Sequence, residues 1–108
     1  LSVDELRSLL QDVRTAAYRI IEGKGATTFA IGLATARILA AIRNDERAVL
    51  PVSALHHVEG VGEVCLSLPS VVGRMGVLST VPVVLDDDER AGLQASARTI
   101  AAVIASLA

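Results

Sequence analysis

Aromatic side chains are almost absent from this sequence: Tyr18 and Phe29 are the only two, and there is no tryptophan. Two rings are too few to form a platform on which nucleic-acid bases stack. The 10 basic and 12 acidic side chains leave a formal net charge of -2 at pH 7, which does not attract a phosphate backbone. We therefore expect no nucleic-acid partner.

Cysteine and long apolar runs are also scarce. Cys65 is the only cysteine, which excludes an intrachain disulfide and a metal site built from several thiolates. No signal-like segment follows the first residue, so we expect a protein of the reducing cytoplasm. No apolar run reaches the ~20 residues that a membrane span needs, and we expect no membrane partner.

Hydrophobic residues, by contrast, make up 52% of the 108 residues. A core of this size cannot bury so many of them, so we expect part of the apolar surface to face another domain or subunit. The sequence begins with Leu1 rather than Met, and we expect it to be a part of a longer protein.

Two capping patterns predict the starts of helices. Ser2 with Glu5, and Asp86 with Glu89, have the spacing of a capping box, in which two residues satisfy each other's backbone N–H groups. They predict a helix over residues 3–22 and a last helix that begins at 86–89. The expected buried stripe of this last helix consists of Leu93, Ala97, Ile100, Ile104 and Leu107.

A second helix is expected to begin at Thr27 or Thr28 and to end near Arg43. Its apolar residues cover nearly every face, so we expect it to be buried on several sides. The run Lys-Gly-Ala-Thr-Thr at residues 24–28 supplies a cation, a glycine and a hydroxyl at the start of this helix. It fits either a plain helix cap or the wall of a small-anion or ligand site.

Residues 63–68 alternate, with Val64, Leu66 and Leu68 on one side and Glu63, Cys65 and Ser67 on the other, which predicts a strand. The apolar run 48–55 and the β-rich segment 77–85 predict two more strands. Pro51 cannot donate to a strand ladder and places the first strand at an edge. The glycine-rich segments 60–62 and 73–76 are expected to be turns rather than phosphate-binding loops. With no crossover helix, the strands should pair antiparallel. The fold predicted is α+β, with helices on one side of an antiparallel sheet and no nucleotide-binding βαβ unit.

Few residues are candidates for chemistry. His56 and His57 could bind a metal or move a proton, but neighbours on an extended chain point apart, and we interpret them as part of a solvated loop. Cys65 is expected to be a small buried side chain rather than a nucleophile. The acidic run 86–88 is interpreted as a helix start rather than a cation site. We expect no metal site.

Residues 17–32, AYRIIEGKGATTFAIG, resemble the run A-Y-x-I-I-x-x-K-G-A-T-x-x-x-I-G of lactate dehydrogenases in the lactate/malate dehydrogenase family. Residues 42–53 and 63–69 resemble later stretches of the same family, so the resemblance covers essentially the whole chain. It implies that residues 1–108 are the C-terminal part of the substrate domain of an NAD-dependent enzyme. The Rossmann domain that binds NAD is absent from this chain, and the expected catalytic His and Arg lie upstream of Leu1.

The resemblance also implies which residues contribute to the site. The position of Thr27 lines the substrate cavity near the methyl end, and the position of Ile31 packs against the nicotinamide ring of NAD. The implied activity is the interconversion of L-lactate and pyruvate by hydride transfer, as in glycolysis and pyruvate fermentation. Thr27 favours lactate over malate, because related malate enzymes often have a smaller residue there.

Two alternatives stay open: a malate dehydrogenase of the same family, and a non-enzymatic oligomerisation module. The implied partners are pyruvate or lactate, the N-terminal NAD-binding part of the same protein, and further copies in a homotetramer. Residues 1–108 alone are expected to be inactive.

Overall fold

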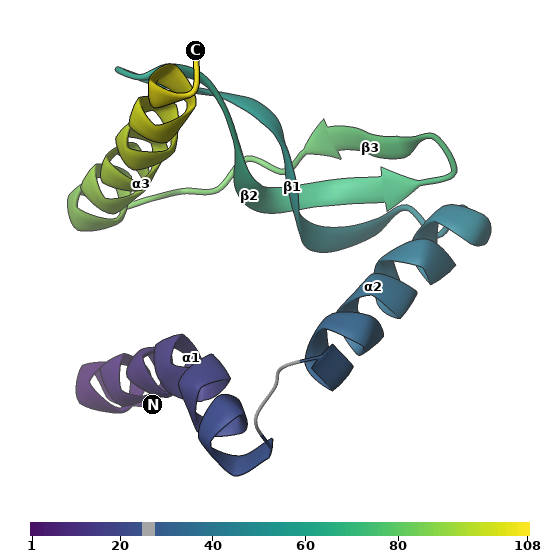
Figure 1. Ribbon diagram of the computed structural model, residues 1–108, viewed down its shortest axis with the longest axis horizontal. Helices are drawn as coiled ribbons and strands as arrows, with labels where there is room; N and C mark the ends of the chain where they lie inside the picture. The colour runs from purple at the N-terminus through teal and green to yellow at the C-terminus, as the bar shows by residue number, and fades with distance from the viewer. Residues whose placement is uncertain (25–27) are drawn as a thin grey trace. The chain divides into compact units, whose positions relative to one another are not determined.

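The computed structural model describes residues 1–24 and 28–108, and this part of the chain contains three helices and a three-stranded antiparallel sheet (Figure 1). The elements in chain order are α1 (Val3–Lys24), α2 (Thr28–Arg43), β1 (Ala48–Val58), β2 (Gly62–Gly73), β3 (Gly76–Thr80) and α3 (Asp87–Ser106). The chain divides into two compact units, Leu1–Arg37 and Ile38–Ala108. The predicted α+β class is confirmed.

Helix α1 begins where the capping pattern predicts. The backbone N–H of Ser2 donates to a Glu5 carboxylate oxygen at 2.6 Å, and the N–H of Glu5 donates to Ser2 Oγ at 3.2 Å. This reciprocal pair satisfies N–H groups that a first helical turn leaves without intrahelical partners. The stripe that the helix presents is apolar and remains exposed: Leu6, Leu9, Leu10 and Val13.

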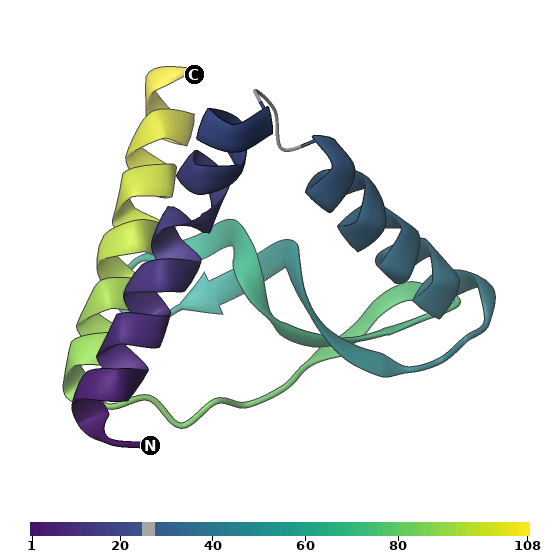
Figure 2. The ribbon, with the colours of Figure 1, turned by 90° about the horizontal axis from the view of Figure 1, so that it is seen from below.

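The sheet has the order β1-β2-β3, so β1 is an edge strand as Pro51 predicts. Pro51 lies opposite Pro69 in the register between β1 and β2. Both strands run several residues beyond their predicted ends, to Val58 and Gly73. Strand β3 is shorter than predicted and ends at Thr80, since Pro82 has no N–H to donate to a ladder. Figure 2 shows the following segment, 81–86, running in extended form to the start of α3.

Helix α3 covers the β1–β2 hairpin near its turn, while β3 pairs with the opposite end of β2 (Figure 1). The core joins Val58, Val64 and Leu66 of the sheet to Ala97 of the helix. The partly buried residues packed around this core are Val61, Leu68, Leu93 and Ile100. The alternation predicted for β2 is confirmed, because Val64 and Leu66 are buried whereas Glu63, Cys65 and Ser67 are exposed.

Two burial predictions are wrong. Ile104 and Leu107, the last residues of the stripe predicted for α3, are exposed because the core ends at Ile100. Helix α2 was expected to be buried on several sides, yet of its described residues only Ala41 is buried. The second unit has a hollow between the end of α2 and the sheet, and the α2 residues that line it are Ile38 and Ile42.

Candidate functional site

Ile31 lies in the first turns of α2, and its side chain is 62% exposed. Beside it, Gly32 has open space where a Cβ would stand, so the helix backbone is accessible there. The hydroxyl of Thr35 donates to the carbonyl oxygen of Ile31 at 2.8 Å and is thereby occupied within the helix. The Ile31 side chain is apolar and has no titratable group, so it can position a flat apolar ring but cannot exchange a proton with it.

Thr27, the other residue expected at the site, lies outside the described residues, as do Gly25 and Ala26. The structure therefore leaves the expected roles of Thr27 and of the 24–28 run as predictions. Ile31 is exposed, as its expected role needs, and that role also stays a prediction.

The prediction of a solvated loop at His56 and His57 is wrong, because β1 continues through both residues and turns them to opposite faces of the sheet. His56 is 8% exposed, and its Nδ1 lies 3.2 Å from Thr80 Oγ1. Its Nε2 is buried without a hydrogen-bond partner. His57 is exposed. Continuing the alternation of β1 past Leu55 could have found this arrangement, since His56 follows Ala54 on the covered face.

The burial predicted for Cys65 is wrong as well. Cys65 lies opposite Leu55 in the sheet register and is exposed. Its neighbours in β2, Val64 and Leu66, occupy the covered face, so a period of two places Cys65 on the other one. Among the described residues, no group of three or more His, Cys, Asp or Glu side chains could hold a metal ion.

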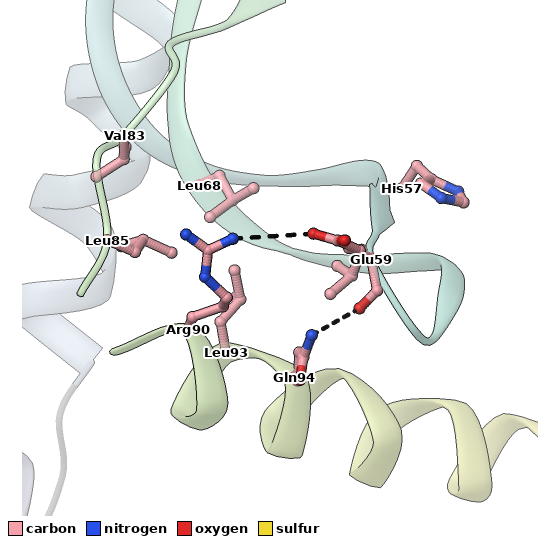
Figure 3. Close-up of a pocket in the computed structure, with 9 residues that line it drawn as sticks. His57, Glu59, Leu68, Val83, Leu85, Arg90, Leu93 and Gln94 are labelled. Atoms are coloured by element: carbon pink, nitrogen blue, oxygen red, sulfur yellow. Dashed lines mark hydrogen bonds and ion pairs between the residues drawn. The ribbon is translucent and has the colours of Figure 1, made fainter. Parts of the chain in front are cut away.

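A hollow of about 160 Å³ lies between the β1–β2 hairpin and the first half of α3 (Figure 3). Arg90 and Gln94 reach from the helix toward Glu59: an Arg90 guanidinium nitrogen is 3.8 Å from a Glu59 carboxylate oxygen, and Gln94 Nε2 donates to the Glu59 carbonyl at 3.0 Å. The Glu59 side chain is 86% exposed, so solvent screens this ion pair. These contacts fasten the hairpin turn to α3 and form no proton-transfer pair.

Two further local predictions are confirmed, the start of α3 and the two glycine-rich turns. Asp86 caps α3 and forms a capping box with Glu89, so the acidic run is a helix start. The two glycine-rich segments are turns, and Gly60, Gly62 and Gly76 have positive φ angles of 78°, 106° and 91°. No helix in residues 1–24 and 28–108 has both the length and the apolar character that a membrane span needs.

The whole chain, residues 1–108, matches the family described as lactate/malate dehydrogenase, alpha/beta C-terminal domain, and it belongs to that family. Within the family, its relatives include L-lactate dehydrogenases. The one from Kosmotoga olearia is 47% identical over 100 residues, which are 92% of this chain and 31% of that protein. The one from Thermus aquaticus is 44% identical over 108 residues, 99% of this chain and 35% of that protein.

A solved structure agrees with these relatives. A lactate dehydrogenase from a Medee basin deep-sea metagenome library superposes with a TM-score of 0.86 at 37% identity, over 93% of this chain and 32% of that one. The chain thus spans about a third of the length of the relatives that it matches.

Proposed function

We propose that the protein to which this chain belongs is an NAD-dependent L-lactate dehydrogenase, and that residues 1–108 are the C-terminal part of its substrate domain. The observation that carries the proposal is the match of the chain, over nearly its whole length, to L-lactate dehydrogenases at 43–48% identity. The structural neighbour with the same fold is also a lactate dehydrogenase.

NAD, when bound, supplies the acceptor or donor of the hydride that moves to or from C2 of the substrate. Ile31 fits a place against the nicotinamide ring, because its exposed aliphatic side chain presents no charge and adjoins the bare backbone of Gly32. Its role is to restrict the ring to a reactive approach and to exclude water from one face. The proton that accompanies the hydride is exchanged by a histidine outside residues 1–108, and arginines there hold the substrate carboxylate.

Thr27 is proposed to fill the space beside the methyl group of pyruvate. Its branched side chain leaves less room than the smaller residue of many malate enzymes, so oxaloacetate, with a second carboxylate, fits less well. Replacing Thr27 with glycine in the complete protein should raise the relative activity on oxaloacetate. An unchanged substrate preference in that variant would remove Thr27 from the pocket.

The apolar stripe of α1 supports a further part of the proposal. Leu6, Leu9, Leu10 and Val13 are each at least half exposed in this chain, which is the surface expected of a helix that packs against another domain or subunit. A homotetramer in the cytoplasm, which also contains the N-terminal NAD-binding part of each subunit, would bury such surfaces. Sedimentation velocity on the complete protein tests the assembly, and a monomer at micromolar concentration would contradict it.

The activity itself is tested by following the oxidation of NADH by its absorbance, with pyruvate as substrate. The complete protein should reduce pyruvate, whereas residues 1–108 alone should not, because the catalytic His and Arg lie elsewhere. Inactivity of the folded complete protein toward both pyruvate and oxaloacetate would favour the alternative of a non-enzymatic oligomerisation module.

A further inference from the structure

Aliphatic side chains line much of the hollow between the β1–β2 hairpin and the first half of α3 (Figure 3). They are Val58, Leu68, Val83, Leu85 and Leu93. The volume of about 160 Å³ is smaller than the roughly 300–1,000 Å³ of pockets that take drug-sized ligands, so the hollow suits an apolar group of a few carbons. All of its lining residues belong to one compact unit, Ile38–Ala108.

Two opposite charges, those of Arg90 and Glu59, also line the hollow. A guanidinium nitrogen of Arg90 lies 3.8 Å from a Glu59 carboxylate oxygen, which is too long for a hydrogen bond, and the two side chains are 55% and 86% exposed. In the part of the chain that the structure describes, no hydrogen bond engages the guanidinium, so its five N–H donors are available. An exposed ion pair of this kind contributes little to stability, so both side chains can turn toward a ligand at small cost.

An aliphatic surface beside one cation and one anion matches the chemistry of an aliphatic α-amino acid. Its carboxylate can accept two parallel hydrogen bonds from the Arg90 guanidinium, its ammonium can donate to the Glu59 carboxylate, and its side chain can lie in the hollow. A simple carboxylate would meet the like charge of Glu59, and a simple amine would meet that of Arg90. The acidic first turn of α3 further disfavours a ligand with a net negative charge, whereas a zwitterion has no net charge.

We propose that this hollow is a binding site for a small aliphatic amino acid such as valine. Arg90 holds the carboxylate of the ligand, Glu59 holds its ammonium, and the aliphatic residues around Leu68 and Leu93 hold its side chain. Binding exchanges the loose Arg90–Glu59 pair for two charge-assisted contacts with the ligand. Because both charges stay near solvent, the expected Kd for valine is about 1 mM. The site needs neither NAD nor pyruvate and is independent of the proposed dehydrogenase function.

The probe is L-valine, titrated into the complete protein with isotope-labelled leucine methyl groups and followed by NMR. We expect saturable shifts of the Leu68 and Leu93 methyl resonances, because both residues line the hollow. Three analogues each lack one part of the ligand: isobutylamine lacks the carboxylate, 3-methylbutanoate lacks the ammonium, and L-alanine lacks two methyl groups. Each analogue should bind at least about fivefold more weakly than valine, since each loses one charge-assisted contact or the burial of two methyl groups.

Two substitutions of exposed side chains remove the matching groups of the protein, and both variants should keep the Tm of the wild type. In Arg90→Gln, valine should bind no more tightly than isobutylamine, and in Glu59→Gln no more tightly than 3-methylbutanoate. The affinity of 3-methylbutanoate should be higher for Glu59→Gln than for the wild type, because the like charge is gone; a merely structural effect does not produce this gain. Arg98→Gln removes the same charge from α3 outside the hollow and should leave the affinity for valine within about twofold.

The absence of saturable shifts at Leu68 and Leu93 up to about 20 mM valine, some twenty times the expected Kd, would overturn the inference. An unchanged affinity for valine in either Arg90→Gln or Glu59→Gln would also overturn it, as would an equal loss in Arg98→Gln, which would indicate a general effect of charge. Binding of isobutylamine or 3-methylbutanoate to the wild type as tightly as valine would assign the hollow to another class of ligand and refute the amino-acid site. The proposed dehydrogenase function is tested separately, by the reduction of pyruvate.

Discussion

Gly73→Ala probes, from the side of the sheet, the contact that the Asp45 carboxylate makes with the turn between β2 and β3. The added Cβ would stand 2.7 Å from Asp45 Oδ1, a separation that real Cβ contacts essentially never show, and 3.0 Å from Leu78 Cδ1. The carboxylate must therefore move, and the hydrogen bond from the Arg74 N–H at 2.9 Å is lost. A hydrogen bond to a charged group contributes about 1.5–3 kcal/mol, and overpacking a buried site costs about 1–3 kcal/mol. Both clashing atoms are the ends of side chains that can move, and the Asp45 side chain is 37% exposed, so solvent replaces part of the lost hydrogen bond. We therefore expect a loss of about 1–3 kcal/mol in the free energy of unfolding.

Urea denaturation of the complete protein, followed by far-UV circular dichroism, measures this loss if the transition of the substrate domain is resolved. The same substitution in the Asp45→Gly background is the sharper test, because the carboxylate that the new methyl group meets is then absent. The cost of Gly73→Ala should fall there by at least ~1 kcal/mol, as expected for two residues in direct contact. Equal costs in the two backgrounds, within about 0.5 kcal/mol, would refute the account of why this position is a glycine.

Three further substitutions test the core, the cap and the buried histidine by urea or thermal denaturation. Val64→Ala removes two methyl groups from a side chain that is 1% exposed and should destabilise the protein by about 1.5–3 kcal/mol; a loss under 0.5 kcal/mol would contradict its place in the core. Asp86→Ala removes the acceptor for the Glu89 N–H at 2.8 Å and should cost about 1 kcal/mol, whereas Asp86→Ser should retain most of the cap. His56→Leu replaces a buried ring whose Nε2 has no hydrogen-bond partner, and we expect a neutral or slightly stabilising effect on the free energy of unfolding. A loss of more than about 2 kcal/mol would show that the contact with Thr80 stabilises the fold by more than the unpaired nitrogen costs.

Local patterns predicted the starts of α1 and α3. Both capping boxes involve residues three apart, so the interaction that begins the helix is contained in the sequence around it. The alternation of Val64 and Leu66 with exposed neighbours likewise depends only on the period of a strand. These features follow from the geometry of one element and need no knowledge of its partners.

Strand ends and burial depend on distant residues and were predicted less well. The extension of β1 through His56 and His57 is set by pairing with Val64 and Glu63, which stabilises a segment whose own sequence indicated a loop. The exposure of Ile104 depends on where the hairpin ends beneath α3. For the site, the sequence indicated Ile31 through family resemblance alone, since an aliphatic residue on an apolar helix has no local signal of function.

The contact of Asp45 with Gly73 and Arg74 was not predicted, because it joins a left-handed aspartate to a backbone N–H in a turn 29 residues away. In the sequence, Asp45 follows Asn44, and this pair of residues is typical of an ordinary turn. Only the tertiary structure shows that the carboxylate lies against Gly73.

The proposed preference of the complete protein for pyruvate is tested most directly by the ratio of kcat/KM for pyruvate to that for oxaloacetate, measured on the complete protein with NADH. We expect pyruvate to be preferred by at least about tenfold, which corresponds to a difference of ~1.4 kcal/mol in transition-state binding. A preference for oxaloacetate would contradict the claim and place the protein among the malate dehydrogenases of the same family.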